Sequence, residues 1–305
     1  METGVAIRPI ENMEAYYDTL NRFVFRSGLT MKPVFAAAKT AKRKRIIYAN
    51  GEDERVLRAA QIVLEEQTAV PLLIGRPHVV EARLKRFGLR IRPNIDFELT
   101  NPENDPRFRD YVNLFLRYTG RRGVSPEVAK TIVRTSTTAI AALAVMREEA
   151  DAMICGLEGR FERHLELIEQ VIGLDSNVHH FSAVSLLISP RRTLFLTDTY
   201  VNEDPSAEEI AEMTVLAAQE IEAFGITPKA ALLSHSNFGS KNTESARKMR
   251  RATEILAHLY PDLEADGEMH GDAALSTVFR DRVFLIHASK EKPICLSFQR
   301  LMPLI

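Results

Sequence analysis

The sequence RIIYANGED, residues 45–53, places a short β-rich run directly before a group of turn-forming residues. A helix is expected next, because Val56, Leu57, Ala60 and Leu64 recur on one face. Residues 70–74 form the following apolar run, which Gly75-Arg76-Pro77 closes. This order predicts a βαβ unit, and therefore a parallel sheet whose ligand sites lie at the carboxyl ends of its strands.

The same alternation of strands and helices continues to the C-terminal half of the chain. Ser125-Pro126-Glu127 has helix N-cap chemistry and predicts one long helix reaching towards Glu149. The further elements expected are a strand at 152–155, a helix ending at Gly173, a hairpin of 183–188 and 193–196, a helix opened by the capping box of Ser206 and Glu209, a strand at 230–233 and a helix at 243–259.

Composition excludes several classes of protein. The 305 residues are 45% hydrophobic and 27% charged, and 40 basic and 41 acidic residues give a formal net charge of −1. Such a balance creates no global field towards nucleic acid or anionic lipid, and no apolar run reaches the roughly 20 residues of a membrane span. The N-terminus lacks signal-peptide features, and the isolated Cys155 and Cys295 argue against disulfides and a structural zinc site. We therefore expect a cytoplasmic protein that binds neither nucleic acid nor membrane.

The first 39 residues are expected to form a linker with a helix near residues 11–25. Five of the seven residues from Lys39 to Arg45 are basic. A solvated linker is the favoured interpretation of this run, with a phosphate-binding patch as the alternative.

The most informative polar stretch follows the strand at 230–233. Small hydrogen-bonding residues lead into a helix there, and unpaired N–H groups at a helix start favour phosphate or carboxylate. The candidate anion-binding residues are Ser234, His235, Ser236, Asn237, Gly239 and Ser240. The alternative is a turn rich in Ser and Asn for capping reasons alone.

Two other polar clusters follow predicted strands. The segment 266–272 holds Asp266, Glu268 and His270, which suit acid–base work or a divalent metal, although pairing with Lys or Arg and helix capping are favoured. Asp198 and Thr199 form a similar cluster. His179-His180 lacks a third ligand and is expected at the surface, and Cys155 is expected in the core. No G-x-G-x-x-G occurs, so a nicotinamide site on this chain is not expected.

Several segments together carry a resemblance to a known family, which extends from residue 4 to about residue 283. They are IIYANGEDERVLRAA, LLIGRP, MICG, FLTDTYVNEDPSAEEIAEMT, ALLSHSNFGS, ARKMRRA and DGEMHGDAAL. The chain resembles the phosphate acetyltransferase family, and more closely the C-terminal acetyltransferase-like domain of bacterial multidomain NADP-dependent malic enzymes. The resemblance implies an α/β/α fold, similar to isocitrate and isopropylmalate dehydrogenases, with two subdomains and a cleft between them.

The resemblance also implies a function. The domain would bind acetyl-CoA as a regulatory effector and assemble as a homo-oligomer, while NADP and a divalent metal would belong to the malic-enzyme part, which converts malate to pyruvate. No cofactor, metal or catalytic residue is then expected in this chain. The alternatives are an active phosphate acetyltransferase, which exchanges acetyl between coenzyme A and phosphate, and a non-functional gene remnant.

The sequence departs from the active enzymes of this family at three places. Their Thr-Leu-Arg-Pro motif corresponds to His164-Leu165-Glu166-Leu167, so Glu166 stands where the catalytic arginine is expected. Their Ser-Thr-Lys-Gly-Ser loop corresponds to residues 236–240, with Phe238 in place of lysine, and their Ser-Arg-Gly motif has no counterpart. The resemblance therefore implies that acetyl transfer is lost.

The resemblance stops at Phe284. In a frame shifted by one base, residues 284–305 back-translate to PHSRLKGEANLSFIPTSDAAN, a segment of the family's kind, and Met302-Pro303 forces an alanine codon there. We expect a frameshift after about residue 283 and no partner strand for the apolar run after Pro293. The expected organisation is a linker (1–39), an incomplete first subdomain (40–150), a second subdomain (151–283) and a tail outside the family (284–305).

Overall fold

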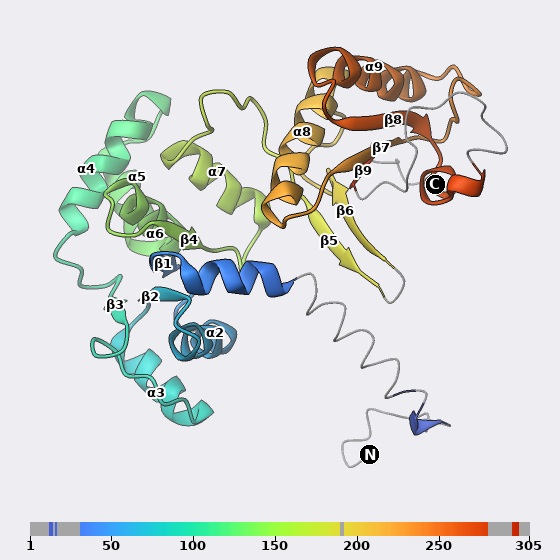
Figure 1. The fold of residues 1–305 in the computed structure, drawn as a ribbon. Helices are drawn as coiled ribbons and strands as arrows, with labels where there is room; N and C mark the ends of the chain where they lie inside the picture. The colour runs from blue at the N-terminus through green and yellow to red at the C-terminus, as the bar shows by residue number, and fades with distance from the viewer. Residues whose placement is uncertain (1–11, 15, 17–30, 190–191, 280–294, 299–305) are drawn as a thin grey trace. The chain divides into compact units, whose positions relative to one another are not determined.

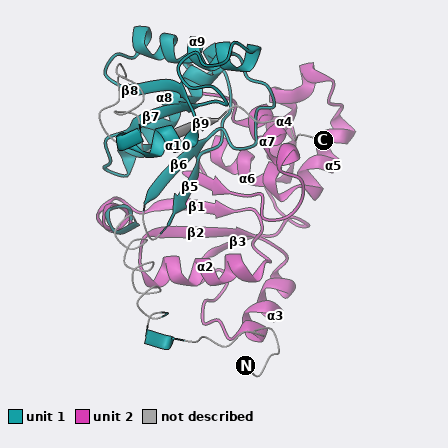
Figure 2. Cartoon of the chain, turned by 90° about the vertical axis from the view of Figure 1, so that its right-hand side faces the viewer, with its two compact units in different colours: residues 1–34, 176–305 teal, residues 35–175 magenta. Residues whose placement is uncertain are grey.

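The structure, a computed structural model, describes residues 12–14, 16, 31–189, 192–279 and 295–298. These residues fall into two compact units: residues 35–175 form unit 2, and residues 1–34 and 176–305 form unit 1 (Figure 2). Each unit has its own sheet with helices on both faces, as the α/β class predicted. The expected linker helix near residues 11–25 lies almost wholly outside the described residues, whereas residues 31–40 are helical.

Unit 2 is built on a four-stranded parallel sheet with the order β3-β2-β1-β4. Its elements are β1 (Lys44–Tyr48), α2 (Glu54–Glu65), β2 (Ala69–Ile74), α3 (Pro77–Phe87), β3 (Glu98–Thr100), α4 (Phe108–Thr119), the 3₁₀ turn η1 (Gly120–Arg122), α5 (Pro126–Thr135), α6 (Thr137–Met146), β4 (Ala152–Ile154) and α7 (Phe161–Val171).

The predicted βαβ unit is confirmed by the parallel pairing of β1 with β2, in which Lys44 lies opposite Ala69 and Tyr48 opposite Leu73. Successive side chains of a strand point to opposite faces. Ile47 accordingly packs with α4–α7, and Tyr48 packs with α2 and α3. Helices therefore cover both faces of this sheet (Figure 1).

The long helix predicted from Ser125 towards Glu149 is wrong, because α5 and α6 are separate helices with a 100° bend between them. Ser136 has extended backbone angles and caps α6 by accepting the Ala139 N–H at 3.2 Å. Among the described residues, no single helix has the length and apolarity to cross a membrane, and only this bent pair meets that test jointly.

The units divide after Asp175, whereas the sequence placed the boundary between its two subdomains near Asp151. The reason is that β4 pairs with β1, with Ile46 opposite Ala152. The following helix α7, predicted correctly with its terminal Gly173 at φ 80°, packs its buried face into the same core as α6. Residues 152–171 therefore complete the sheet and core of unit 2.

Unit 1 contains a five-stranded sheet with the order β5-β6-β9-β7-β8, in which only β5 is antiparallel. Its elements are β5 (Ser185–Ile188), β6 (Thr193–Thr197), α8 (Ala207–Ala223), β7 (Lys229–Leu233), α9 (Glu244–Leu259), β8 (Glu264–Met269), α10 (Gly271–Leu275) and β9 (Cys295–Phe298).

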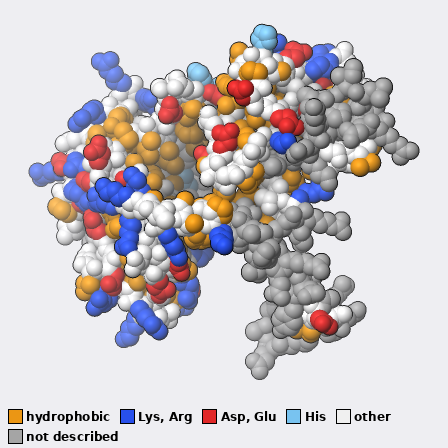
Figure 3. Space-filling view, viewed as in Figure 1, with side chains coloured by type: hydrophobic (Ala, Val, Ile, Leu, Met, Phe, Trp, Pro, Cys, Tyr) orange, Lys and Arg blue, Asp and Glu red, His pale blue; other side chains and the backbone are white. Residues whose placement is uncertain are grey.

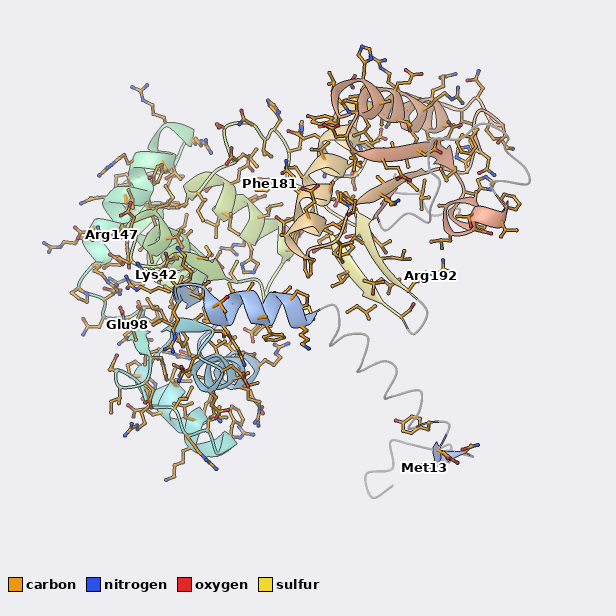
Figure 4. All side chains as sticks on the ribbon, in the orientation of Figure 1. Met13, Lys42, Glu98, Arg147, Phe181 and Arg192 are labelled. Atoms are coloured by element: carbon orange, nitrogen blue, oxygen red, sulfur yellow. The ribbon has the colours of Figure 1, made fainter. Side chains whose placement is uncertain are left out.

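Local signals in unit 1 are confirmed. The β5–β6 hairpin forms, with Arg192 (labelled in Figure 4) at its turn, and Ser206 and Glu209 form the predicted capping box of α8. Along β7, Ala230 and Leu232 face the cores under α8 and α9, whereas Ala231 and Leu233 face the core under α10. Because β7 and β8 are parallel, the loops that follow them start at the same edge of the sheet.

The expectation that the apolar run after Pro293 has no partner strand is wrong. Residues Cys295–Phe298 form β9, which pairs in parallel with β6 on one side and β7 on the other. Four residues of the expected tail thereby join two parts of the sheet. Residues 280–294 and 299–305 lie outside the described part of the chain, so the expected frameshift stays a prediction.

Candidate functional site

The loop between β7 and α9 is built around the carboxylate of Glu268, a fully buried residue of β8. The Ser236 hydroxyl donates to Glu268 Oε1 at 2.8 Å, and the Gly239 amide donates to the same oxygen at 2.9 Å. From α9, Arg250 Nη2 donates to Oε1 at 3.1 Å and Nε to Oε2 at 3.2 Å. Two donors of the predicted anion-binding loop therefore bind an anion that the chain itself supplies.

These contacts set the charge state of Glu268. Burial by itself would raise the pKa of the carboxyl, but the hydrogen bonds from Arg250, Gly239 and Ser236 outweigh it, so the pKa lies below its ordinary value. The group is ionised at neutral pH. Its charge is balanced by the Arg250 guanidinium, which is 35% exposed.

Hydrogen bonds of the other loop residues stabilise the loop in this conformation around Glu268. Ser236 is fully buried, and its hydroxyl also accepts the Lys241 amide at 3.0 Å, which closes the loop. The Asn237 side chain accepts the His270 amide at 2.7 Å, and the Ser240 hydroxyl accepts the Asn237 amide at 2.9 Å. Gly239 has a φ of 89°, in the left-handed region that favours glycine.

The outer part of this loop is less enclosed. The Thr243 hydroxyl, which caps α9, lies 3.0 Å from His235 Nε2. Ser234 accepts the Ser236 amide through its hydroxyl at 3.2 Å. The structure thus brings together the loop residues, Glu268 and the His270 backbone, largely through internal hydrogen bonds.

The second predicted cluster is also organised internally. The Asp198 carboxylate accepts the backbone amides of Ala183 at 3.0 Å and Asn202 at 2.6 Å, and the Asn202 side chain also donates to the carbonyl of Phe181 (labelled in Figure 4). Thr199 Oγ1 lies 3.1 Å from Ser185 Oγ. Because β9 lies between β6 and β7, one strand separates this cluster from the Glu268 loop.

The residues of segment 266–272 do not form one cluster. Asp266 and Glu268 lie inside β8 rather than beyond its end, and the buried Asp266 accepts the neighbouring Gly267 amide at 2.9 Å. His270 begins α10 without a side-chain cap. The favoured interpretation, pairing with Lys or Arg, holds for Glu268. Within the described residues, no three His, Cys, Asp or Glu side chains form a group suited to a metal ion.

His164 and Glu166 lie on α7, where the resemblance placed catalytic residues. His164 Nε2 lies 2.7 Å from the Glu158 carbonyl and therefore carries the proton, while Nδ1 lies 2.8 Å from the Thr138 hydroxyl. Glu166 is exposed. At the position where the resemblance implies an arginine, the chain therefore exposes the carboxylate of Glu166.

Cys155 and the paired histidines have structural contacts. Cys155 packs partly buried against the core of unit 2, as expected, and burial raises the pKa of its thiol. His179 and His180 lie at the surface, as expected, but they contact α8: His179 Nδ1 is 3.0 Å from Glu212, and His180 Nε2 is 2.8 Å from Glu209.

Sequence reasoning missed a cavity of about 490 Å³ at the carboxyl edge of the unit 2 sheet. We call it the strand-end cavity, and its lining residues come from the end of β2, from the loops after all four strands and from α3, α5 and α6. They are Ala49, Asn50, Gly51, Glu52, Asp53, Ile74, Gly75, Arg76, Arg83, Pro102, Glu103, Arg134, Thr137 and Glu158. The signal was present in the turn residues 50–53 and 75–77, which end two adjacent parallel strands.

Glu52 organises this cavity. Its carboxylate accepts the Arg76 amide at 2.9 Å and the Arg76 guanidinium at 2.8 and 2.9 Å, and its carbonyl accepts Arg83. The hydrogen bond from Arg76 lowers the pKa of the Glu52 carboxyl against the opposing effect of burial. A Cβ on Gly51 would lie 2.7 Å from the Ile74 carbonyl oxygen, so the close approach of the two loops requires glycine.

Comparison with known proteins gives the following matches. The family described as phosphate acetyl/butaryl transferase matches residues 29–290. This match extends past residue 283, the expected end of the resemblance. An NAD-dependent malic enzyme of Rhizobium meliloti is 65% identical over 282 residues, and an NADP-dependent malic enzyme of Escherichia coli is 46% identical over 281 residues. Both alignments cover 92% of this chain, and the chain spans only 37% of the length of either relative.

Solved structures agree with the fold. A phosphotransacetylase from Streptococcus pyogenes is 27% identical with a TM-score of 0.80, and the match covers 88% of this chain and 81% of that one. The EutD phosphotransacetylase from Staphylococcus aureus, at 22% identity and a TM-score of 0.76 over 90% of this chain and 81% of its own, has the same fold.

Proposed function

The chain belongs to the phosphate acetyl/butaryl transferase family, and we propose that it is the acetyl-CoA-binding regulatory module of a malic enzyme, without acetyl-transfer activity of its own. The two malic enzymes with 65% and 46% identity support the assignment to a malic enzyme. Oxidative decarboxylation of malate, together with NADP and the divalent metal, is proposed for residues outside this chain. We place the module in the cytoplasm, as a homo-oligomer.

The observation that carries the non-catalytic part of this proposal is the buried Glu268 carboxylate. Transfer of acetyl to phosphate needs donors for a phosphate oxyanion, and both the Ser236 hydroxyl and the Gly239 amide already bind Glu268. The exposed Glu166 adds a negative charge where the resemblance implies an arginine. A phosphate anion at this loop would have to displace Glu268 from these donors.

The alternative, an active phosphate acetyltransferase, is favoured by the match to solved phosphotransacetylases over most of the chain. A coupled assay separates the two functions by measuring acetyl phosphate formed from acetyl-CoA and orthophosphate. We expect no acetyl phosphate above the background without protein. Turnover would contradict the regulatory proposal and establish the alternative.

Acetyl-CoA binding is tested by the thermal midpoint of the full chain. A ligand that binds only the folded state at a hundred times its Kd stabilises that state by about 2.7 kcal/mol. We therefore expect acetyl-CoA to raise the midpoint, with acetate as the control that should not. An unchanged midpoint at millimolar acetyl-CoA would refute binding. Light scattering after size-exclusion chromatography tests the oligomer, and a monomer would contradict that part.

A further inference from the structure

The connector between the two units is attached to α8 by two adjacent histidines. It comprises residues 172–184, from the end of α7 to the start of β5, and includes His179 and His180. The His179 amide donates to Glu212 Oε1 at 2.9 Å, and His179 Nδ1 lies 3.0 Å from the same oxygen. His180 Nδ1 lies 3.0 Å from Glu212 Oε2, and His180 Nε2 lies 2.8 Å from Glu209 Oε1. We call these four side chains, all of which belong to unit 1, the histidine clamp.

The contacts of His180 require a protonated ring. A neutral imidazole has one N–H donor and one bare acceptor nitrogen, whereas an imidazolium donates through both nitrogens. Both ring nitrogens of His180 face carboxylate oxygens, at 3.0 and 2.8 Å, and a bare nitrogen at such a distance would repel the oxygen. His180 therefore makes both contacts only as a cation.

The surroundings of the two rings are simple. Within the part of the chain that the structure describes, Glu209 and Glu212 are the only charged groups that pair with either ring. The two ring centres are 6.4 Å apart, so each ring also lies near the charge of the other. The His179 side chain is 76% exposed, and Figure 3 shows histidine side chains at the molecular surface near acidic ones. Solvent protons therefore reach the clamp.

The two glutamates keep their negative charges while the histidines titrate. Burial alone would raise the pKa of Glu212, but the hydrogen bonds from His180 and His179 outweigh it and lower that pKa. The Ser206 amide, which donates at 2.6 Å, holds the pKa of Glu209 below its ordinary value. Histidine is the side chain that changes charge between about pH 5 and 8. Loss of its proton removes the cation and leaves Glu209 and Glu212, three residues apart on one helix, to repel each other.

We propose that the histidine clamp is a pH-sensitive switch, which holds the connector on α8 when His179 and His180 are protonated and releases it when they lose their protons. The next part of the connector is attached without histidine, because Asp198 accepts the Ala183 amide at 3.0 Å. Release therefore concerns the segment around residues 179–180 and leaves Ala183 in place. The switch does not depend on acetyl-CoA, so it goes beyond the proposed function and is tested separately from it.

The test is amide hydrogen exchange of the full chain at about pH 5.5 and about pH 8.5, on either side of histidine titration, with each rate corrected for the intrinsic effect of pH on exchange. Protection of the His179 amide should fall about tenfold at the higher pH, which corresponds to the loss of one hydrogen bond to a charged group. The Ala183 amide is the internal control and should keep its protection.

Three variants assign the effect to the clamp. His180→Gln removes the titrating ring, and Glu212→Gln removes the carboxylate that faces both histidines. Each should abolish the pH dependence at the His179 amide. His258→Gln, at an exposed histidine of α9 outside the clamp, is the matched control and should keep the pH response of the unaltered chain.

Equal protection of the His179 amide at the two pH values in the unaltered chain would overturn the inference. An equal loss of protection at Ala183 would also overturn it, because the whole region would then loosen without a switch. If His180→Gln does not fold, Glu212→Gln decides the question by itself. A pH response that persists in Glu212→Gln contradicts the pairing, whereas its loss, with the response retained in His258→Gln, supports the switch.

Discussion

Replacing Glu268 with glutamine tests whether an internal carboxylate holds the loop between β7 and α9. Glutamine keeps the shape of the side chain and removes its charge. The Glu268 side chain accepts four hydrogen bonds, two of them from Arg250, one from Ser236 and one from Gly239. In the variant the amide nitrogen faces a donor wherever it replaces an oxygen. At least one contact with Arg250 is therefore lost.

The magnitude follows from the contacts. A hydrogen bond to a charged group contributes about 1.5–3 kcal/mol, and breaking a fully buried ion pair costs about 3–5 kcal/mol. Arg250 is 35% exposed, so water compensates part of its loss, and we expect a decrease of about 2–3 kcal/mol in the free energy of unfolding. At about 2–4 °C per kcal/mol for a chain of this size, the midpoint falls by about 4–12 °C.

The effect should depend on pH in a definite direction. The folded pKa of Glu268 lies below its ordinary value, so the unfolded chain binds the proton more readily than the folded one. The stabilisation is complete above the unfolded pKa of about 4.3 and is lost as pH falls through the folded pKa. The difference between the unaltered chain and Glu268→Gln should thus be largest at neutral pH and shrink in acid.

The assay is urea denaturation followed by circular dichroism, with amide hydrogen exchange at Gly239 as the local measurement. Exchange at this amide should accelerate in Glu268→Gln, because its acceptor is weakened. Arg251→Gln, on the same helix, is the control: its pair with Glu254 is 3.2 Å long and both side chains are about 60% exposed. It should change stability by less than about 0.5 kcal/mol. Equal stabilities of Glu268→Gln and the control would refute the reasoning.

Two further predictions concern buried groups. The Thr197 hydroxyl is buried without a hydrogen-bond partner among the described residues, so Thr197→Val should raise the free energy of unfolding by about 1 kcal/mol. Thr214→Val removes a 2.7 Å hydrogen bond to a backbone carbonyl and should lower the free energy of unfolding. The opposite order of stability in urea denaturation would contradict this account. Gly51→Ala should destabilise unit 2 by more than about 1 kcal/mol, because its Cβ would lie 2.7 Å from the Ile74 carbonyl oxygen. Gly120→Ala is the control and should be tolerated, because Gly120 has open space around it. Equal thermal midpoints of the two variants would exclude the close approach at Gly51.

Local physical chemistry in the sequence determined much of the fold. The capping box of Ser206 and Glu209 joins residues three apart, and the alternation of apolar and turn residues at 45–53 needs no distant partner. Such signals act over a few residues, so the βαβ unit, the hairpin and most helix starts can be predicted from the sequence alone. The sequence does not reveal the break at Ser136, because a serine can also lie inside a helix; in the structure its hydroxyl caps α6 by accepting the Ala139 amide.

The candidate site depended on contacts that sequence spacing does not reveal. Glu268 lies 32 residues from Ser236 and 18 from Arg250, and only the parallel pairing of β7 with β8 brings them together. The sequence predicted a loop rich in donors, but tertiary structure decided that an internal carboxylate uses them. In the same way, the strand-end cavity exists because four strands end at one edge, and Glu52 meets Arg76 across two loops 24 residues apart. Chain geometry in three dimensions, and not residue type, selects which of several possible partners each charge finds.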